Sequence, residues 1–346
     1  MIGFDMRPNF QRLGEIIILL VYFAMSTSTF AQQKLAQAGM KWLTVGTDAR
    51  ASALAGAVTA TEGYSSAMFY NPAGMSRLST GVNVAFGKTL WIADIDYSYA
   101  SVAIRPGDGE WGVFGLSVQG VDYGDLTARV RSETDPRGYI ETGTFTPSAW
   151  MIGLGYARAF GDKFSIGGNV KYAKQNLGSG YTQIAGGGLS GFKDYSVDVY
   201  AFDLGVLYHT GYKSLTFGMS VRNFSKEISY IKEEFQLPLT FRIGLSMDVM
   251  DWFDMNKEQQ GFLLTVDAEH PRDYQEQIRI GGEYTFFKLV AFRAGYISGT
   301  NEEGVSLGIG ALKAYNDEGG TLGADYAYTP FGVFGNVHRF SFQISF

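Results

Sequence analysis

The chain has no cysteine, so a disulfide framework, a thiolate metal site and a thiol nucleophile are all excluded. Its three histidines, His209, His270 and His338, lie far apart, and none has a second ligand at the spacing of a metal site. A net charge of −6 argues against nucleic acid as a partner, because nucleic-acid-binding surfaces are basic. The sequence therefore indicates no cofactor, no metal and no nucleic acid.

The chain also lacks an apolar run long enough for a transmembrane helix, which needs about 20 residues. Its main apolar run covers only residues 16–25 and follows Arg7 and Arg12. Small residues then lead to Ala31 and Gln32, a pattern typical of an export signal cleaved between these two residues. We therefore expect residues 1–31 to be a signal peptide. The alternative is an anchor that is not cleaved.

Glycine and aromatic residues are abundant instead, with 45 glycines and 15% aromatic residues. From about residue 80 onward, segments of alternating polarity are followed by turns rich in Gly, Asp, Asn or Lys. In residues 240–248, for example, Phe241, Ile243 and Leu245 alternate with polar or small residues. A β-strand places successive side chains on opposite faces, so this period of two predicts strands with one apolar face.

Fourteen such segments follow one another. They lie near residues 80–89, 93–105, 110–122, 143–160, 162–177, 193–210, 213–229, 236–249, 260–270, 275–286, 288–298, 303–314, 320–330 and 334–346. Several connections are tight, whereas those at 123–142, 178–192 and 250–259 are long, and we expect the long ones to be extracellular loops. The pattern predicts an all-β fold, a fourteen-stranded antiparallel transmembrane β-barrel over residues 80–346. Such a barrel belongs in the outer membrane of a Gram-negative bacterium.

The last segment indicates what the apolar face contacts. Four large apolar residues share one parity there: Phe340, Phe342, Ile344 and Phe346. A closed barrel is the sheet that can sit in lipid, because all of its backbone groups are paired. We expect these side chains to face outer-membrane lipid. A terminal aromatic strand of this kind also resembles the signal read by the barrel assembly machinery.

Residues 32–79 do not follow the alternating pattern. Small residues dominate, and residues 50–60 are rich in alanine and glycine, which suits a short helix or a compact coil. Fourteen strands enclose a wider lumen than the roughly eight-stranded barrel that side chains alone can fill. We therefore predict that residues 32–79 form an N-terminal plug, or hatch, which lumen-facing glycines allow to approach the wall closely.

This segment carries a resemblance to known proteins. Residues 46–78, "GTDARASALAGAVTATEGYSSAMFYNPAGMSRL", resemble the N-terminal signature of the PorV/PorQ family of outer-membrane proteins. The runs at 90–103, 164–172 and 201–224 also fall where members of that family have such runs. The "ALAG" at 53–56 departs from many relatives, which have Met-Gly there. The resemblance covers most of the mature chain and implies a FadL-like barrel with an N-terminal hatch.

Within the hatch, "NPAG" is similar to the plug motif of the FadL long-chain fatty-acid transporters. The plug residues that the resemblance implies are Arg50, Asn71, Pro72, Ala73 and Gly74. Pro72 and Gly74 are typical of a turn, so the motif is either a structural turn or a hinge on which the hatch moves.

The function that the resemblance implies is divided. PorV is an accessory of type IX secretion that binds exported proteins and the translocon, and PorQ acts in surface attachment of the same cargo. We expect a non-enzymatic barrel that serves type IX protein secretion or cargo attachment and binds protein through its extracellular loops. The alternative is a FadL-like uptake channel for hydrophobic small molecules such as fatty acids.

Charged residues recur on the strand face opposite the apolar one. The lumen-facing polar residues that we expect include Asp203, Arg222, Arg242, Arg279, Glu283, Arg293 and Asp325. Their mixed signs predict ion pairs within the wall and between wall and plug. The alternative is a carboxylate-binding site in which Arg242, Arg279 and Arg293 hold a fatty-acid head group. The "GVSLG" at 304–308 matches a nucleophile-elbow pattern but falls in mid-strand, so we expect no catalytic residue.

Overall fold

The computed structural model describes residues 38–183, 189–253, 259–315 and 319–346, with only the backbone described for 181–183 and 189–192. The chain divides into two units, Met1–Lys34 and Leu35–Phe346. The predicted signal peptide, residues 1–31, lies outside the described residues. Among the described residues, no helix is both long and apolar enough to cross a membrane.

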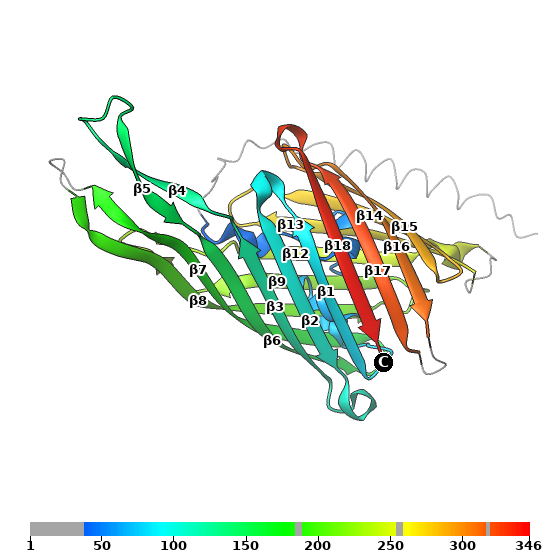
Figure 1. Ribbon diagram of the computed structural model, residues 1–346. Coiled ribbons are helices and arrows are strands. Elements are labelled where there is room, and N and C mark those ends of the chain that lie inside the picture. Colours follow the sequence, from blue (N-terminus) through cyan, green and yellow to red (C-terminus); the bar gives the residue numbers. More distant parts are fainter. Residues whose placement is uncertain (1–37, 184–188, 254–258, 316–318) are drawn as a thin grey trace, which may run out of the picture. The chain divides into compact units, whose positions relative to one another are not determined.

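Fourteen antiparallel strands form one closed barrel, which confirms the predicted fold (Figure 1). Their bounds are β1 (Val82–Leu90), β2 (Asp96–Ile104), β3 (Val113–Asp122), β6 (Ser148–Phe160), β7 (Phe164–Gln183), β8 (Leu189–His209), β9 (Thr216–Ser225), β12 (Thr240–Asp248), β13 (Gln260–Pro271), β14 (Gln277–Phe286), β15 (Val290–Ser298), β16 (Val305–Ala314), β17 (Thr321–Pro330) and β18 (Asn336–Ser345). Each strand pairs with the next barrel strand in the chain, and β18 pairs with β1. Each of the fourteen predicted segments overlaps one of these strands.

The alternation in the sequence corresponds to the two faces of the wall. Along β6, exposed and buried residues alternate from Ser148 to Arg158. The outward side chains are largely apolar; Leu154 on β6 is 66% exposed and Leu204 on β8 is 63% exposed. The inward side chains are buried, and many are polar or small. An apolar outside around a polar inside is the polarity that a barrel needs in lipid.

Aromatic side chains form rows on the outer surface. Near one end, Tyr172 lies between Trp150 and Tyr200, with ring centroids 5.6 and 5.2 Å away. Toward the other end, Phe160 and Phe164 are 6.4 Å apart. Aromatic rings prefer the two interfaces of a membrane, so these rows are in the place expected of aromatic girdles.

The two ends of the barrel differ. At one, which we call the loop end, the connection after β3 contains the hairpin β4 (Leu126–Arg131) and β5 (Tyr139–Phe145). The connection after β9, at the same end, contains the small hairpin β10 (Ile228–Ser229) and β11 (Glu234–Phe235). The other, which we call the turn end, holds the start of β1 and the C-terminus (Figure 1). Long extracellular loops and short periplasmic turns are the rule for outer-membrane barrels.

One of the three predicted extracellular loops is at the wrong end. The connection after β12 covers residues 249–259, and β12 is the eighth barrel strand in the chain. After an even number of crossings the chain is back at the end where β1 began, which is the turn end. In agreement, the Ser214 amide in the turn after β8 donates to Asp251 Oδ2 at 2.9 Å. The prediction that 250–259 is an extracellular loop is therefore wrong.

The C-terminal strand closes the barrel. Its pairing with β1 extends to the last residue, because the Val82 amide donates to the Phe346 carbonyl at 2.7 Å. Phe340, Phe342 and Phe346 are exposed on the outer face, and Ile344 is half-buried. Phe342 stacks on Phe86 of β1, with ring centroids 5.5 Å apart. The outward direction of this face is as predicted; its role as an assembly signal stays a prediction.

The N-terminal segment, residues 38–80, consists of short helices and turns. These are the 3-10 helices η1 (Lys41–Thr44), η2 (Ser65–Phe69) and η3 (Pro72–Met75) and the α-helix α2 (Ala49–Ala53). Further 3-10 helices occur at η4 (Ile92–Asp94), η5 (Pro106–Gly109), η6 (Val249–Trp252) and η7 (Gly332–Phe334). Asp48 caps α2 by accepting from the Ala51 amide at 2.7 Å. Nearly every residue from Ala49 to Met75 is buried, so the segment has almost no face for solvent.

Candidate functional site

Glycines let the N-terminal segment touch the inner wall on several sides. A Cβ atom added at Gly167 of β7 would lie 2.5 Å from the Ala73 nitrogen, and one at Gly295 of β15 would lie 2.4 Å from the Ala55 nitrogen. Further close approaches occur on β6, β8, β9, β14 and β16, which makes seven strands in all, at Gly155, Gly205, Gly218, Gly281 and Gly308. Since these strands surround the lumen, the segment lies inside the barrel. Its action as a plug stays a prediction.

The "NPAG" motif is fixed against β7 and β8. Asn71 Oδ1 accepts from the Ala73 amide at 3.1 Å and so caps η3. Asn71 Nδ2 donates to the Thr59 carbonyl at 2.7 Å and to the Val206 carbonyl of β8 at 3.1 Å. Pro72 occupies the first turn of η3, and a Cβ added at Gly74 would lie 2.8 Å from the Thr61 carbonyl oxygen. The motif is thus a buried, hydrogen-bonded turn; whether it also acts as a hinge stays a prediction.

Wall arginines hold the backbone of the segment. Arg242 Nη1 donates to the Gly56 carbonyl at 3.0 Å, and Arg279 Nη1 donates to the Ala55 carbonyl at 2.8 Å. On the other side of the lumen, Arg339 Nε donates to the Gly46 carbonyl at 2.8 Å. Irregular backbone needs such partners when it is buried, and the strands supply them.

Two glutamates, Glu283 and Glu269, form ion pairs with Arg242, Arg279 and Arg293 of the predicted lumen residues. Glu283 accepts from both Nε and Nη2 of Arg50, at 2.8 and 2.9 Å, and also pairs with Arg293 at 2.5 Å. Arg293 in turn pairs with Asp325 at 2.6 Å. These contacts are the ion pairs within the wall and to the segment that the mixed signs predict.

Glu269 forms the second group. It pairs with Arg242 at 2.8 Å and with Arg279 at 2.5 Å. The three arginines of the alternative prediction, a fatty-acid head-group site, therefore already have carboxylate partners in Glu269, Glu283 and Asp325.

Arg50 is the charged residue of the segment in this network. Burial alone lowers the pKa of an arginine, but the charge and hydrogen bonds of Glu283 more than offset this effect, so the pKa of Arg50 is raised. The neighbouring Tyr64 is buried as well, and burial raises its pKa to about 12. Arg50 therefore stays ionised and Tyr64 stays neutral at physiological pH.

Toward the loop end, part of the inner wall is apolar. Apolar inward residues of β3, β6, β7 and β8 there are Val121, Ala149, Met151, Ala173, Val197 and Val199. They form one cluster with Trp42, Leu43, Phe69 and Tyr70 of the segment. The β10–β11 hairpin covers this cluster with Ile228 and Phe235, and Tyr230 OH donates to Gln175 Oε1 of β7 at 3.0 Å.

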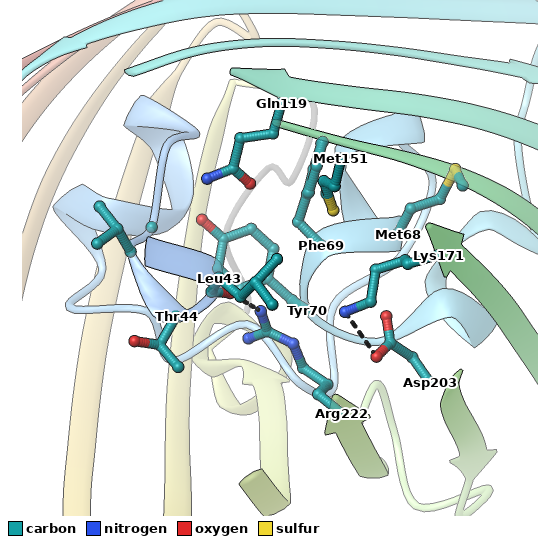
Figure 2. A pocket seen from close by; sticks show the side chains of 12 residues that line it. Leu43, Thr44, Met68, Phe69, Tyr70, Gln119, Met151, Lys171, Asp203 and Arg222 are labelled. Atoms are coloured by element: carbon teal, nitrogen blue, oxygen red, sulfur yellow. Dashed lines mark hydrogen bonds and ion pairs between the residues drawn. The ribbon is translucent and has the colours of Figure 1, made fainter. Parts of the chain in front are cut away.

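A small pocket of about 10 Å³ borders this cluster (Figure 2). Its walls include Leu43, Phe69, Tyr70, Gln119, Met151, Lys171, Asp203 and Arg222. Lys171 Nζ lies 2.8 Å from Asp203 Oδ1, and the two side chains point toward each other at one side of the pocket. A space of this size holds about one water molecule.

A larger cavity of about 350 Å³ lies between the segment and the strands from β14 round to β2. Its charged and hydroxyl-bearing walls include Asp48, Arg50, Glu62, Tyr64, Tyr99, Glu283, Arg293 and Asp325. Lys288 and Leu289 of the turn after β14 also line it, so it lies toward the turn end. Its volume is at the lower end of the range of about 300–1,000 Å³ that is usual for small-molecule sites.

Some residues that line these two pockets were not predicted from the sequence. Asp203 and Arg222 were expected in the lumen, but Tyr70 and Gln119, which complete their pocket, were not. His209, expected to be isolated, has Nε2 3.1 Å from Glu62 Oε2. Among the described residues, no group of His, Cys, Asp and Glu side chains suits a metal ion.

Comparisons with known proteins agree with the fold. No family model matches the chain, and no curated protein matches its sequence. The CymD monoaromatic hydrocarbon channel shares 14% identity and a TM-score of 0.55, covering 87% of this chain and 98% of that one. The Ralstonia pickettii toluene transporter TbuX shares 14% identity and a TM-score of 0.54, covering 86% and 97%. A Pseudomonas aeruginosa FadL homologue shares 11% identity and a TM-score of 0.54, covering 87% and 98%.

At identities this low, the likeness concerns the fold: the chain has the closed fourteen-stranded architecture of FadL-like barrels. No comparison supports membership of the PorV/PorQ family.

Proposed function

We propose that the chain is an integral outer-membrane channel that takes up small molecules with an apolar body through its lumen. The observation that carries this proposal is the apolar inner wall beside the N-terminal segment. The lumen of a water-filled barrel is polar. Here apolar side chains turn inward instead and form one cluster with Trp42 of the segment; they include Val121, Met151, Val197 and Val199.

Two further observations support the same function. The outer face is apolar with aromatic rows at both ends, which suits an integral barrel of the outer membrane. Three solved structures of similar fold carry the names of a hydrocarbon channel, a toluene transporter and a FadL homologue. The small pocket is lined by β3, β6, β7, β8 and β9, and the larger cavity by strands from β14 round to β2, so the two lie against different parts of the wall and both border the N-terminal segment.

The hypothesis that the protein serves type IX secretion stays a prediction. Its natural site is the β4–β5 hairpin at the loop end, whose side chains are mostly exposed on both faces. A protein that binds cargo only with its loops does not need an apolar lumen, so the apolar part of the inner wall favours the channel.

The test is uptake of a radiolabelled aromatic probe by liposomes that contain the purified protein. Uptake faster than in protein-free liposomes, and saturable by unlabelled probe, supports the channel. Uptake equal to that of protein-free liposomes, together with co-purification of exported proteins from outer membranes, contradicts it and favours secretion.

A further inference from the structure

The 3-10 helix η1 crosses the lumen near the loop end. Its Lys41 forms an ion pair with Asp273 in the connection after β13, which is at the loop end because β13 is the ninth barrel strand. The next residue, Trp42, accepts at its carbonyl from Gln119 Nε2 of β3. Five strands separate β3 from β13 on one side of the barrel and seven on the other, so the two lie almost opposite each other. η1 therefore forms a bar across the lumen beside the apolar cluster.

The wall holds η1 less firmly than it holds the rest of the segment. The Trp42 and Leu43 carbonyls accept from wall side chains only at 3.4 Å, and Trp42 Nε1 has no partner among the described residues. Met40, just before η1, has a φ of 50°, a left-handed conformation that is unfavourable for a residue with a side chain. From Gly46 on the chain is fixed again, since Arg339 Nε donates to the Gly46 carbonyl at 2.8 Å.

Two tethers attach η1 to connections of the loop end. The Gly39 amide donates to the Gln236 carbonyl at 3.0 Å, and Gly39 packs directly on the Phe235 ring of the β10–β11 hairpin. The other tether is the ion pair of Lys41 with Asp273, whose side chain is 1% exposed against 37% for Lys41. No second cation pairs with Asp273 among the described residues, and its Oδ1 has no hydrogen-bond partner there. A buried carboxylate with one cation depends on that cation, because its loss leaves the charge without compensation.

We propose that η1 is a gate at the loop end of the lumen and that the Lys41–Asp273 ion pair is its latch. While the latch is closed, Trp42 and Leu43 pack against the loop-end side of the apolar cluster. When the ion pair opens, residues 38–45 move away about Gly46, and the cluster becomes accessible to small apolar molecules. This inference rests on the proposed channel function and adds the step that opens the channel to its substrates.

The first test measures access to the cluster in the purified protein, without transport. Met151 lines the small pocket together with Leu43, and the chain has no cysteine, so Met151→Cys provides a single reporter thiol beside η1. We expect a water-soluble maleimide to label this thiol slowly, and about tenfold faster once Lys41→Met is added, because the latch is then broken. Lys226→Met, at an exposed position of the same end, is the matched control and should leave the labelling rate unchanged.

Charge reversal distinguishes a latch from a general loss of stability. Lys41→Glu places a like charge beside Asp273 and should also speed labelling. Adding Asp273→Lys restores the pair with exchanged signs and should slow labelling again. Hydrogen exchange in Lys41→Met should become faster over residues 38–45 and stay unchanged over residues 46–78. Resistance of each unheated barrel to denaturing electrophoresis shows that it is folded.

Three results overturn the gate: equal labelling with and without Lys41→Met, no rescue by Asp273→Lys, or faster exchange over residues 46–78 as well. Liposome uptake of p-xylene separates the gate from the channel, and we expect Lys41→Met to raise it. Faster labelling of Lys41→Met, with no uptake by any variant, supports the latch and refutes the channel. Equal labelling together with equal, saturable uptake by the intact protein and Lys41→Met leaves the channel standing and refutes only the gate.

Discussion

Asn71 shows how one side chain can join the N-terminal segment to the wall. Its amide bonds to the segment at Ala73 and Thr59 and to β8 at Val206. At the same point Gly205 has no room for a side chain, because a Cβ there would fall on Asn71 Oδ1. The contact depends on the amide and the missing Cβ together.

Replacing Asn71 with alanine should loosen the segment without opening the barrel. The carbonyls of Thr59 and Val206 lose a buried donor, which costs about 1–3 kcal/mol for each unsatisfied group. Hydrogen exchange followed by mass spectrometry should become faster over residues 46–78 and stay unchanged in β12–β18. Asn301→Ala, at an exposed position, is the control. Unchanged protection of residues 46–78 contradicts this role of Asn71.

At this scale the sequence predicts residue types and faces but not partners. The inward parity of Arg242, Arg279 and Glu283 follows from strand alternation alone. Their partners do not, because Arg50 and Glu283 are 233 positions apart and the segment has no periodicity to set its path. The same holds for Glu62 and His209, which are 147 positions apart.

Among the elements, the barrel strands were predictable and the loop hairpins were not. A strand with lipid on one side and a packed lumen on the other carries a strong period of two. The β4–β5 hairpin is exposed on both faces, so its sequence shows no such period. The β7–β8 hairpin was predicted too short because its glycine-rich residues 178–192 read as a loop.

The two loop-end hairpins should differ in importance. Among the described strands, β4 and β5 pair only with each other, so replacing residues 124–146 with a Gly-Ser linker should leave the barrel and probe uptake intact. The same treatment of residues 228–235 should change uptake, because that hairpin covers the apolar cluster. Liposome uptake with both variants measures this. If the first deletion abolishes uptake, the β4–β5 hairpin belongs to the route, contrary to our account.

For the whole molecule, the account requires that the N-terminal segment occupies the lumen. A barrel of fourteen strands is too wide for its own side chains to fill. Deleting residues 38–76 should therefore give a barrel with a stable, large ionic conductance in planar bilayers, whereas the intact protein should conduct little. Equal conductance of the two barrels, once folding is verified by electrophoresis, is the result that our account does not allow.

The most direct measurement asks whether passage needs the segment to move. Ser65 Oγ of the segment lies 2.9 Å from Ser101 Oγ of β2, and the chain has no cysteine of its own. Ser65→Cys with Ser101→Cys should form a disulfide that ties segment to wall. The control, Ser306→Cys with Thr329→Cys, ties two neighbouring wall strands whose hydroxyls are 3.1 Å apart.

We predict that oxidation of the Ser65–Ser101 pair stops uptake of the aromatic probe into liposomes, that reduction restores it, and that the wall–wall pair transports in both states. Uptake that continues at full rate through the oxidised Ser65–Ser101 barrel would contradict a route that opens by displacement of the N-terminal segment.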